Sequence, residues 1–126
     1  FKSYQVGKLD FFEQIYLFNN AKIIIGPHGA AFTNIVFSNP DLNLVEIIPD
    51  NHPSKKCKRI CSLLKIDYTR IETPEITNKK ISGDMYISVK EIEEVLNKFL
   101  WVKLSIYDNF FYFEECILAL NHQDLS

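Results

Sequence analysis

A short segment of the chain places two glycines, a histidine and polar side chains directly after an apolar run. Lys22 to Ile25 predicts a buried strand, and Gly26 and Gly29 follow it on either side of His28. Amides at the start of the next helix favour a phosphate group, and a histidine beside them can donate a hydrogen bond to an anion. The segment is therefore a candidate anion-binding turn, to which the following residues contribute: Gly26, His28, Gly29, Ala30, Ala31, Thr33 and Asn34.

Simpler interpretations of this turn stay open. Glycines at a strand-to-helix junction often serve only the bend or a close approach of the backbone, and a single loop histidine is structural in many proteins. The spacing of Gly26 and Gly29 lacks the third glycine of the dinucleotide-binding fingerprint, and no Walker A lysine follows it. Spacing alone thus indicates an anion site without identifying its ligand.

A carboxylate interrupts the next apolar run of the chain. Glu46 stands between Val45 and Ile47, twenty residues after Gly26, which is about where a ribose-binding acid follows a phosphate turn in nucleotide-binding βαβ units. Burial of an unpaired charge is costly, so we expect the side chain to have a partner or to lie near the strand end. We predict the diphosphate at residues 26–30 and the ribose hydroxyls at Glu46; an exposed glutamate on an edge strand is the alternative.

The flanking segments alternate between helical and strand patterns. Asp10 is placed to cap a helix that reaches Asn20, and Glu13 stands at its third position, which is the capping-box arrangement. Apolar runs predict strands, and apolar positions at helical spacing predict helices. After the first helix we expect a strand at 22–25, a helix at 29–36, a strand at 43–48, a helix at 54–65, strands at 66–71 and 85–87, and a helix at 88–100.

This alternation is typical of βαβ units with helices on both faces of a parallel sheet. We predict an α/β fold in which residues 1–100 form a Rossmann-like three-layer domain with a short parallel sheet. Residues 101–126 are aromatic-rich and different in character. They are expected to form a C-terminal helical tail, packed on this domain or on a missing one, whose apolar stripe is Phe110, Phe113, Ile117 and Leu120.

Composition narrows the class of protein. The chain has 126 residues, 47% of them hydrophobic, and a net charge of −2, which favours one folded domain and disfavours generic nucleic-acid binding. No apolar run is long enough to span a membrane, no signal peptide is present, and a start at Phe1 suggests a fragment. Cys57 and Cys61 lack a second ligand pair for zinc, so we expect no metal and place them inward on the helix at 54–65. The outward face of that helix carries Lys55, Lys56, Lys58 and Arg59.

A longer string of residues resembles the glycosyltransferase 61 family. The matching positions are Phe12-Glu13-Gln14-Ile15, Leu17-Phe18, Ala21-Lys22, Ile24-Ile25-Gly26-Pro27-His28-Gly29-Ala30, Thr33-Asn34 and Val45-Glu46. The resemblance covers residues 10–72 and extends to about residue 100. The family includes plant xylosyl- and arabinosyltransferases that decorate xylan, animal O-linked N-acetylglucosaminyltransferases and bacterial capsular-polysaccharide proteins.

The resemblance implies a GT-B enzyme with two Rossmann-like domains, of which this chain is similar to the C-terminal, donor-binding one. The implied reaction is a metal-independent, inverting transfer from a nucleotide sugar, commonly a UDP-sugar, to a glycan or protein acceptor. Acceptor binding and the catalytic base are expected in the missing N-terminal domain, and His28 is a candidate for catalysis within this chain. The implied donor-binding residues are Gly26, His28, Gly29, Ala30, Thr33, Asn34 and Glu46, together with Ala31, where many relatives have glycine.

Other classes give alternatives. A non-catalytic α/β interaction module of a polysaccharide-assembly complex is the alternative function, and nucleotide binding without sugar transfer would distinguish it. A dehydrogenase-type domain lacks its three-glycine fingerprint, and a phosphoacceptor domain lacks an acidic cluster after the first strand. A bacterial-type protein is expected in the cytoplasm, with or without membrane association, and a eukaryotic one in the lumen of the Golgi or the endoplasmic reticulum.

Overall fold

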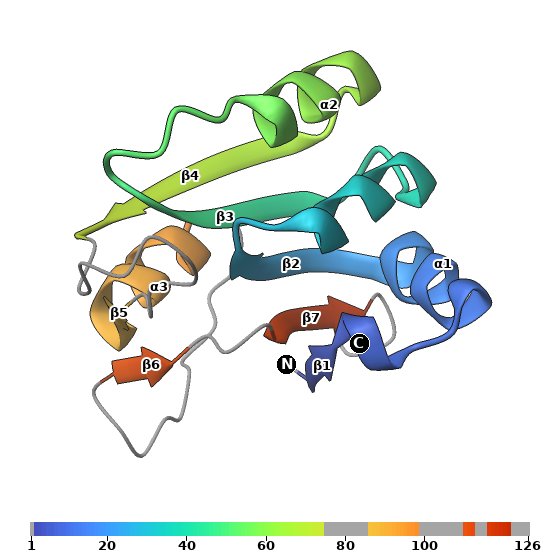
Figure 1. The fold of residues 1–126 in the computed structure, drawn as a ribbon, viewed down its shortest axis with the longest axis horizontal. Coiled ribbons are helices and arrows are strands. Elements are labelled where there is room, and N and C mark those ends of the chain that lie inside the picture. Colours follow the sequence, from blue (N-terminus) through green and yellow to red (C-terminus); the bar gives the residue numbers. More distant parts are fainter. Residues whose placement is uncertain (1, 75–85, 99–109, 113–115, 122–126) are drawn as a thin grey trace.

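A five-stranded sheet organises the part of the chain that the computed structural model describes, namely residues 2–74, 86–98, 110–112 and 116–121 (Figure 1). Its strand order is β1-β7-β2-β3-β4. The parallel half consists of β2 (Ala21–Pro27), β3 (Asn43–Pro49) and β4 (Asp67–Thr73). Because both faces of β2 and β3 are covered, these strands are near-continuous apolar runs, as in other buried parallel sheets. The three strands predicted at 22–25, 43–48 and 66–71 are confirmed.

Helices connect and follow these strands. They are α1 (Phe11–Asn20), the 3-10 helix η2 (Ala30–Phe37), α2 (Lys56–Leu64) and α3 (Val89–Leu96). The predicted capping box on Asp10 with Glu13 is present, and so is the one on Ser88 with Glu91, which the same spacing of three residues predicts for the helix at 88–100. The helix expected at 29–36 is a tighter 3-10 helix, and α3 ends at Leu96, whereas the prediction extended it to residue 100.

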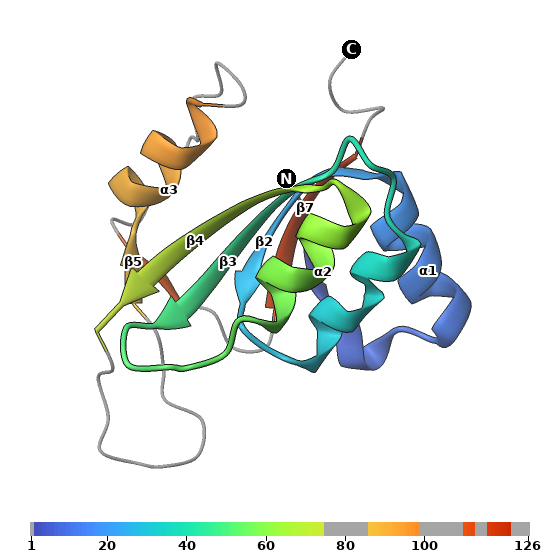
Figure 2. The ribbon, with the colours of Figure 1, turned by 90° about the horizontal axis from the view of Figure 1, so that it is seen from above.

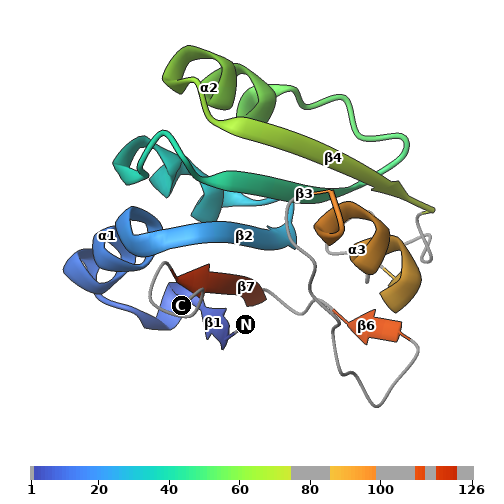
Figure 3. The same ribbon diagram turned by 180° about the vertical axis from the view of Figure 1, so that it is seen from behind.

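The helices form two layers on opposite faces of the sheet. α1, η2 and α2 lie on one face, and α3 lies on the other (Figures 2 and 3). Side chains alternate between the faces along each strand, so Ile24 and Leu44 pack in one core and Ile25 and Val45 in the other. The first core includes the inward side of α2, and the second includes Leu96 of α3. The predicted three-layer α/β arrangement is confirmed.

The C-terminal segment differs from the prediction. A helical stripe was expected from Phe110 to Leu120, but the structure has β6 (Phe110–Tyr112) and β7 (Cys116–Asn121), and Phe113 lies outside the described residues. β7 pairs antiparallel with both β1 (Lys2–Gln5) and β2, so the sheet is mixed. A short apolar run does not by itself distinguish a strand from a buried helix, and here the open edge of β2 decided the outcome.

Smaller elements complete the fold. β5 (Tyr86–Ser88), expected at 85–87, pairs antiparallel with β6 in a separate two-stranded sheet. A 3-10 turn, η1 (Val6–Lys8), links β1 to α1 and was not predicted. Among the residues that the structure describes, no helix has the length and apolar character needed to cross a membrane.

Two predicted helix faces are partly wrong. On α1 the apolar residues Phe11, Ile15 and Phe18 lie at helical spacing and were expected to face inward, but Phe11 is 59% exposed, and Leu17 is buried beside Phe18. On α2 the cysteines are buried as predicted, whereas Leu64, which shares their helical spacing and was expected on the same inward face, is 36% exposed. In both helices the outermost turn of the predicted stripe extends beyond the sheet that it was expected to cover.

Candidate functional site

Three polar side chains from different elements meet at the carboxyl ends of β2 and β3. His28, in the loop after β2, lies with its Nδ1 2.5 Å from Oε1 of Glu46 on β3. The hydroxyl of Tyr68, on β4, donates to the other oxygen, Oε2, at 2.5 Å. Each carboxylate oxygen therefore has its own partner within the protein.

The position of Glu46 follows from strand alternation. Glu46 lies two residues after Leu44 and so points to the same face of the sheet, toward α2. Its residue partner across the parallel ladder is Gly26, which has no side chain to compete for that space. Glu46 is 2% exposed. The carboxylate is thus buried beneath the turn that carries His28, with a protein partner on each oxygen.

Cysteines of α2 adjoin this carboxylate. Burial, followed by the charge of Glu46 and a hydrogen bond to it, raises the pKa of the Cys57 thiol far above its ordinary value. Burial and the same carboxylate raise the pKa of Cys61 to about 11. Burial and hydrogen bonding to Glu46 likewise raise the pKa of Tyr68. These groups therefore keep their protons in the folded chain, and Tyr68 stays a hydrogen-bond donor.

His28, Glu46 and Cys57 are residue types that bind zinc, and their donor atoms all lie within 4.8 Å of one another. Two nitrogen or oxygen ligands of a tetrahedral zinc ion stand roughly 3.3 Å apart, because each lies about 2.0–2.1 Å from the ion. The 2.5 Å separation of His28 Nδ1 and Glu46 Oε1 is shorter than this. The arrangement fits a hydrogen bond between the two side chains better than a shared ion.

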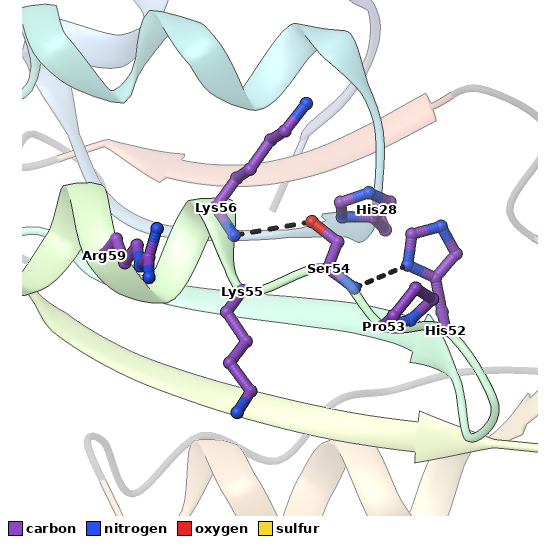
Figure 4. A pocket seen from close by; sticks show the side chains of 7 residues that line it. All are labelled: His28, His52, Pro53, Ser54, Lys55, Lys56 and Arg59. Carbon is purple, nitrogen blue, oxygen red and sulfur yellow. Dashed lines mark hydrogen bonds between the residues drawn. The ribbon is translucent and has the colours of Figure 1, made fainter.

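An open pocket of about 550 Å³ lies beside His28 (Figure 4). The rings of His28 and His52 stand next to each other there, with their centroids 4.5 Å apart. Lys56 extends from the start of α2, and Lys55 points the other way. No carboxylate is among the lining residues, which are His28, His52, Pro53, Ser54, Lys55, Lys56 and Arg59.

The loop between β3 and α2 is held in place by Arg70 of β4. Its guanidinium donates to the backbone oxygens of His52 at 3.1 Å and of Ser54 at 2.9 Å. The backbone N–H of Ser54 in turn donates to Nδ1 of His52 at 3.2 Å. Because that nitrogen accepts, the hydrogen of a neutral His52 is on Nε2, the other ring nitrogen. Arg70 therefore shapes one wall of the pocket without lining it.

The N-terminus of α2 lacks a side-chain cap. Lys55 occupies the cap position without a capping hydrogen bond, and the first turn contains no acidic residue. The hydroxyl of Ser54 accepts from the Lys56 amide at a long 3.4 Å. The positive end of a helix dipole is thus surrounded by cationic side chains, an arrangement that favours a bound anion.

The predicted motif residues divide into two groups. His28 lines the pocket, and Gly29 and Ala30 are exposed at the start of η2. Ala31 is half-buried against the core. Asn34 is turned inward, where its amide donates to Gln14 of α1 at 2.9 Å, and the hydroxyl of Thr33 donates to its own helix at the oxygen of Ala30. The structure does not bring the last two side chains to the pocket.

Gly26 was expected to let the chain turn sharply as it leaves the strand, and Gly29 to let the backbone approach a ligand without a Cβ in the way. Neither Gly26 nor Gly29 has a positive φ, and β2 continues through Gly26 to Pro27, so no sharp turn occurs at residue 26. A methyl group at Gly29 would meet only the oxygen of Pro27, at 3.9 Å. Space above the backbone, and not conformational strain, distinguishes Gly29.

Sequence reasoning missed four residues of this region, namely His52, Lys56, Arg59 and Tyr68. The two basic residues were placed on an outward helix face, as they are, but their proximity to His28 depends on how α2 packs. One signal was available in the sequence: residues 55–59 place four cations and no acid at the start of a predicted helix, which is opposite to the usual preference.

Comparison with known proteins bears on the class of this protein. A family model described as Glycosyltransferase 61 matches residues 1–45, which include α1, β2, the His28 turn and η2. The match ends one residue before Glu46. No curated protein and no solved structure matches the chain. The resemblance to the glycosyltransferase 61 family is thereby confirmed over residues 1–45, and it supports assignment of the protein to the glycosyltransferases in general.

Proposed function

We propose that this chain is the donor-binding domain of a GT-B glycosyltransferase and that its pocket holds the diphosphate of a nucleotide sugar, with a UDP-sugar as the first choice. One observation carries the proposal: His28, which belongs to the family motif, lines the same pocket as Lys56 and Arg59 of the next βα unit. The pocket lies at the carboxyl ends of parallel strands, where α/β folds bind their ligands.

The charge of the pocket matches a diphosphate. Lys56 and Arg59 supply cations, and the exposed N-terminus of α2 adds a positive partial charge. The first amides of η2, at Ala30 and Ala31, are not among the pocket lining but follow His28 directly in the chain, and the open space at Gly29 would let a ligand extend from the pocket toward them. Charge-assisted hydrogen bonds to phosphate are among the strongest that a protein makes. A basic pocket of this kind would select the diphosphate over the uridine or the sugar.

Glu46 has a different role here from the ribose contact predicted from the sequence. Its carboxylate is 2% exposed, and both oxygens have protein partners, so it acts on His28 and not on the ligand. Basic groups and helix N-termini stabilise a diphosphate leaving group without a metal. We therefore keep a metal-independent transfer and place the glycan or protein acceptor on an N-terminal domain outside this chain.

Calorimetric titration of the chain with UDP and with uridine tests the proposal. UDP is expected to bind at least about tenfold more tightly than uridine, because the diphosphate makes the charge-assisted contacts. His28→Ala and Arg59→Ala are each expected to weaken UDP binding. Lys58→Ala is the matched control, since Lys58 is an exposed cation of the same helix that does not line the pocket.

Two results would contradict the proposal. Equal affinity for UDP and uridine would show that the pocket does not bind the diphosphate. No binding of either ligand by a folded chain would remove the donor-binding assignment as a whole. If the full-length protein binds UDP-sugars but neither transfers nor hydrolyses the sugar, that result would favour the non-catalytic interaction module instead.

A further inference from the structure

Glu46 is a buried carboxylate on which several elements converge. Oε1 lies 2.5 Å from the ring of His28, which follows β2, and Oε2 accepts from Tyr68 of β4. Cys57 of α2 approaches from the helix layer. An ionised carboxylate can only accept hydrogen bonds, so Nδ1 of His28 must carry the hydrogen in this contact. The other ring nitrogen, Nε2, is then the one available to the pocket that His28 lines.

We propose that Tyr68 and Glu46 are positioning residues that hold the His28 ring with Nδ1–H toward the carboxylate and Nε2 toward the diphosphate of the bound donor. This inference rests on the proposed function and extends it to Tyr68, a residue outside the pocket lining and outside the matched family segment. We call the chain of hydrogen bonds from Tyr68 through Glu46 to His28 the relay. No covalent bond is made or broken in it. It orients a donor for a phosphate oxygen.

Burial makes the relay effective. Glu46 is 2% exposed, and hydrogen bonds in such surroundings are stronger than in water, while an unpaired polar group there is costly. If Tyr68 did not donate to Oε2, the carboxylate would gain freedom to rotate, and the ring of His28 would lose its fixed partner. The raised pKa of Tyr68 keeps the phenol protonated and so preserves the donor. Tyr68 is thus coupled to the ligand through two intervening residues, Glu46 and His28.

The same logic is known from metal and triad sites, where a carboxylate sets the tautomer and orientation of a histidine. Here the histidine faces a pocket lined by Lys56 and Arg59. A ring fixed in this way offers one directed hydrogen bond, which mobile lysine side chains do not. His28 would therefore set where the diphosphate sits, and the basic side chains would supply most of the attraction.

Nitrogen-15 NMR of the histidine-labelled chain, combined with UDP titration, tests this relay. We compare the wild type, Tyr68→Phe and Glu46→Gln, and assign the His28 signals by their loss in His28→Asn. The wild type should show a protonated Nδ1, and its Nε2 signal should shift on addition of UDP. Tyr68→Phe should mix the tautomers of His28 and weaken UDP binding about threefold to tenfold, which is the effect of one lost hydrogen bond. Glu46→Gln should cause larger changes in both readouts.

Tyr4→Phe is the matched control, because Tyr4 is also a half-buried tyrosine packed on the same core and lies away from the pocket. It should change neither the His28 signals nor the affinity. Should Tyr68→Phe fail to fold, Glu46→Gln carries the test alone. UDP binding by the wild type, with His28 signals and affinity unchanged in the folded variants, overturns the relay and leaves the proposed function standing. No UDP binding by the folded wild type overturns the proposed function and the relay with it.

Discussion

The N-termini of α1 and α3 contrast with that of α2. α1 begins with Asp10 and Glu13, whose side chains exchange hydrogen bonds with each other's backbone amides, both at 2.8 Å. α3 repeats this arrangement with Ser88 and Glu91. α2 has Lys55 at its cap position, no side-chain cap and no acid in its first turn. The capped helices bond their first amides to their own side chains, whereas α2 has in place of a cap the long 3.4 Å contact between the Lys56 amide and the Ser54 hydroxyl.

The difference between these helix N-termini concerns what each contributes: those of α1 and α3 favour helix stability, and that of α2 favours an anion. A capping box stabilises a helix by satisfying its orphan amides and by placing negative charge at the positive end of the dipole. A cation at the same end destabilises an exposed helix by about 0.3–1 kcal/mol. The start of α2 carries such cations, and it lies at the His28 pocket, to which α1 and α3 contribute no lining residue. A helix start that is poor for folding is suited to an anion.

The largest expected effect comes from giving α2 the charge pattern of the other helices. Lys56→Glu combined with Arg59→Glu should reduce UDP affinity at least about 100-fold, because two charge-assisted contacts are lost and replaced by repulsion. The free energy of unfolding should stay unchanged or rise slightly, since acids now face the positive end of the dipole. Calorimetry and urea denaturation measure the two quantities on the same variant.

Lys58→Glu is the matched control for this double variant. It brings the charge reversal of one of the two substitutions to the same helix, at an exposed position that does not line the pocket. Its UDP affinity should fall by less than about threefold, the size of a weak screened effect. A loss as large as that of the double variant would mean that net charge, and not pocket contact, controls binding.

A smaller effect is expected from Arg70, which holds the uncapped helix start through its loop. Arg70→Gln removes two donors to the backbone oxygens of His52 and Ser54. Hydrogen bonds from a charged donor contribute about 1.5–3 kcal/mol in protected sites, and partial exposure of Arg70 reduces this, so we expect a loss of about 1–2 kcal/mol in stability. UDP affinity should fall about tenfold. If the Arg70→Gln variant is destabilised but its UDP affinity is unchanged, the loop between β3 and α2 has no role in UDP binding.

Exchanging the caps should change stability by about 1 kcal/mol in opposite directions. Asp10→Ala removes the cap of α1 and should destabilise the chain by about 1 kcal/mol without changing UDP affinity. Lys55→Asp installs a cap on α2 and should stabilise the ligand-free chain by about 0.5–1 kcal/mol while weakening UDP binding. Urea midpoints and calorimetry give both values. If Lys55→Asp both stabilised the chain and tightened UDP binding, the expectation that a cap on α2 favours stability at the expense of anion binding would be wrong.

Features that depend on residues close together in the sequence could be predicted, whereas those that depend on contacts between distant segments could not. The capping boxes at Asp10 and Ser88 were predictable because each depends on residues three apart. Strands β2 and β3 were predictable because their apolar runs are bounded by breakers. β7 was not, because its place between β1 and β2 depends on an open strand edge that only the folded sheet provides.

The site divides in the same way. His28 and Glu46 were identified from type and spacing, but the predicted ribose contact of Glu46 required knowledge of burial, and the structure places both oxygens on protein partners. Tyr68 and Arg59 come from later elements, so their proximity to His28 follows from strand order and helix packing. Asn34 matches the family motif, yet it serves the contact between η2 and α1 through Gln14.

The inward face of α2 gives the last and most narrowly confined prediction. Burial, then the charge of Glu46, raises the pKa of Cys61 from an ordinary 9.0 to about 11, so the folded chain holds this proton where the unfolded chain releases it. Stability is then unaffected below pH 9.0 and falls as the pH rises toward about 11. Cys57 and Tyr68 shift in the same direction. Urea midpoints measured across this range should decline more steeply for the wild type than for Cys61→Ala, and the difference between the two profiles isolates the thiol from other groups that titrate at alkaline pH. Parallel profiles would show that the Cys61 thiol ionises as readily in the fold as outside it, and that the carboxylate beneath α2 exerts no such effect on this thiol.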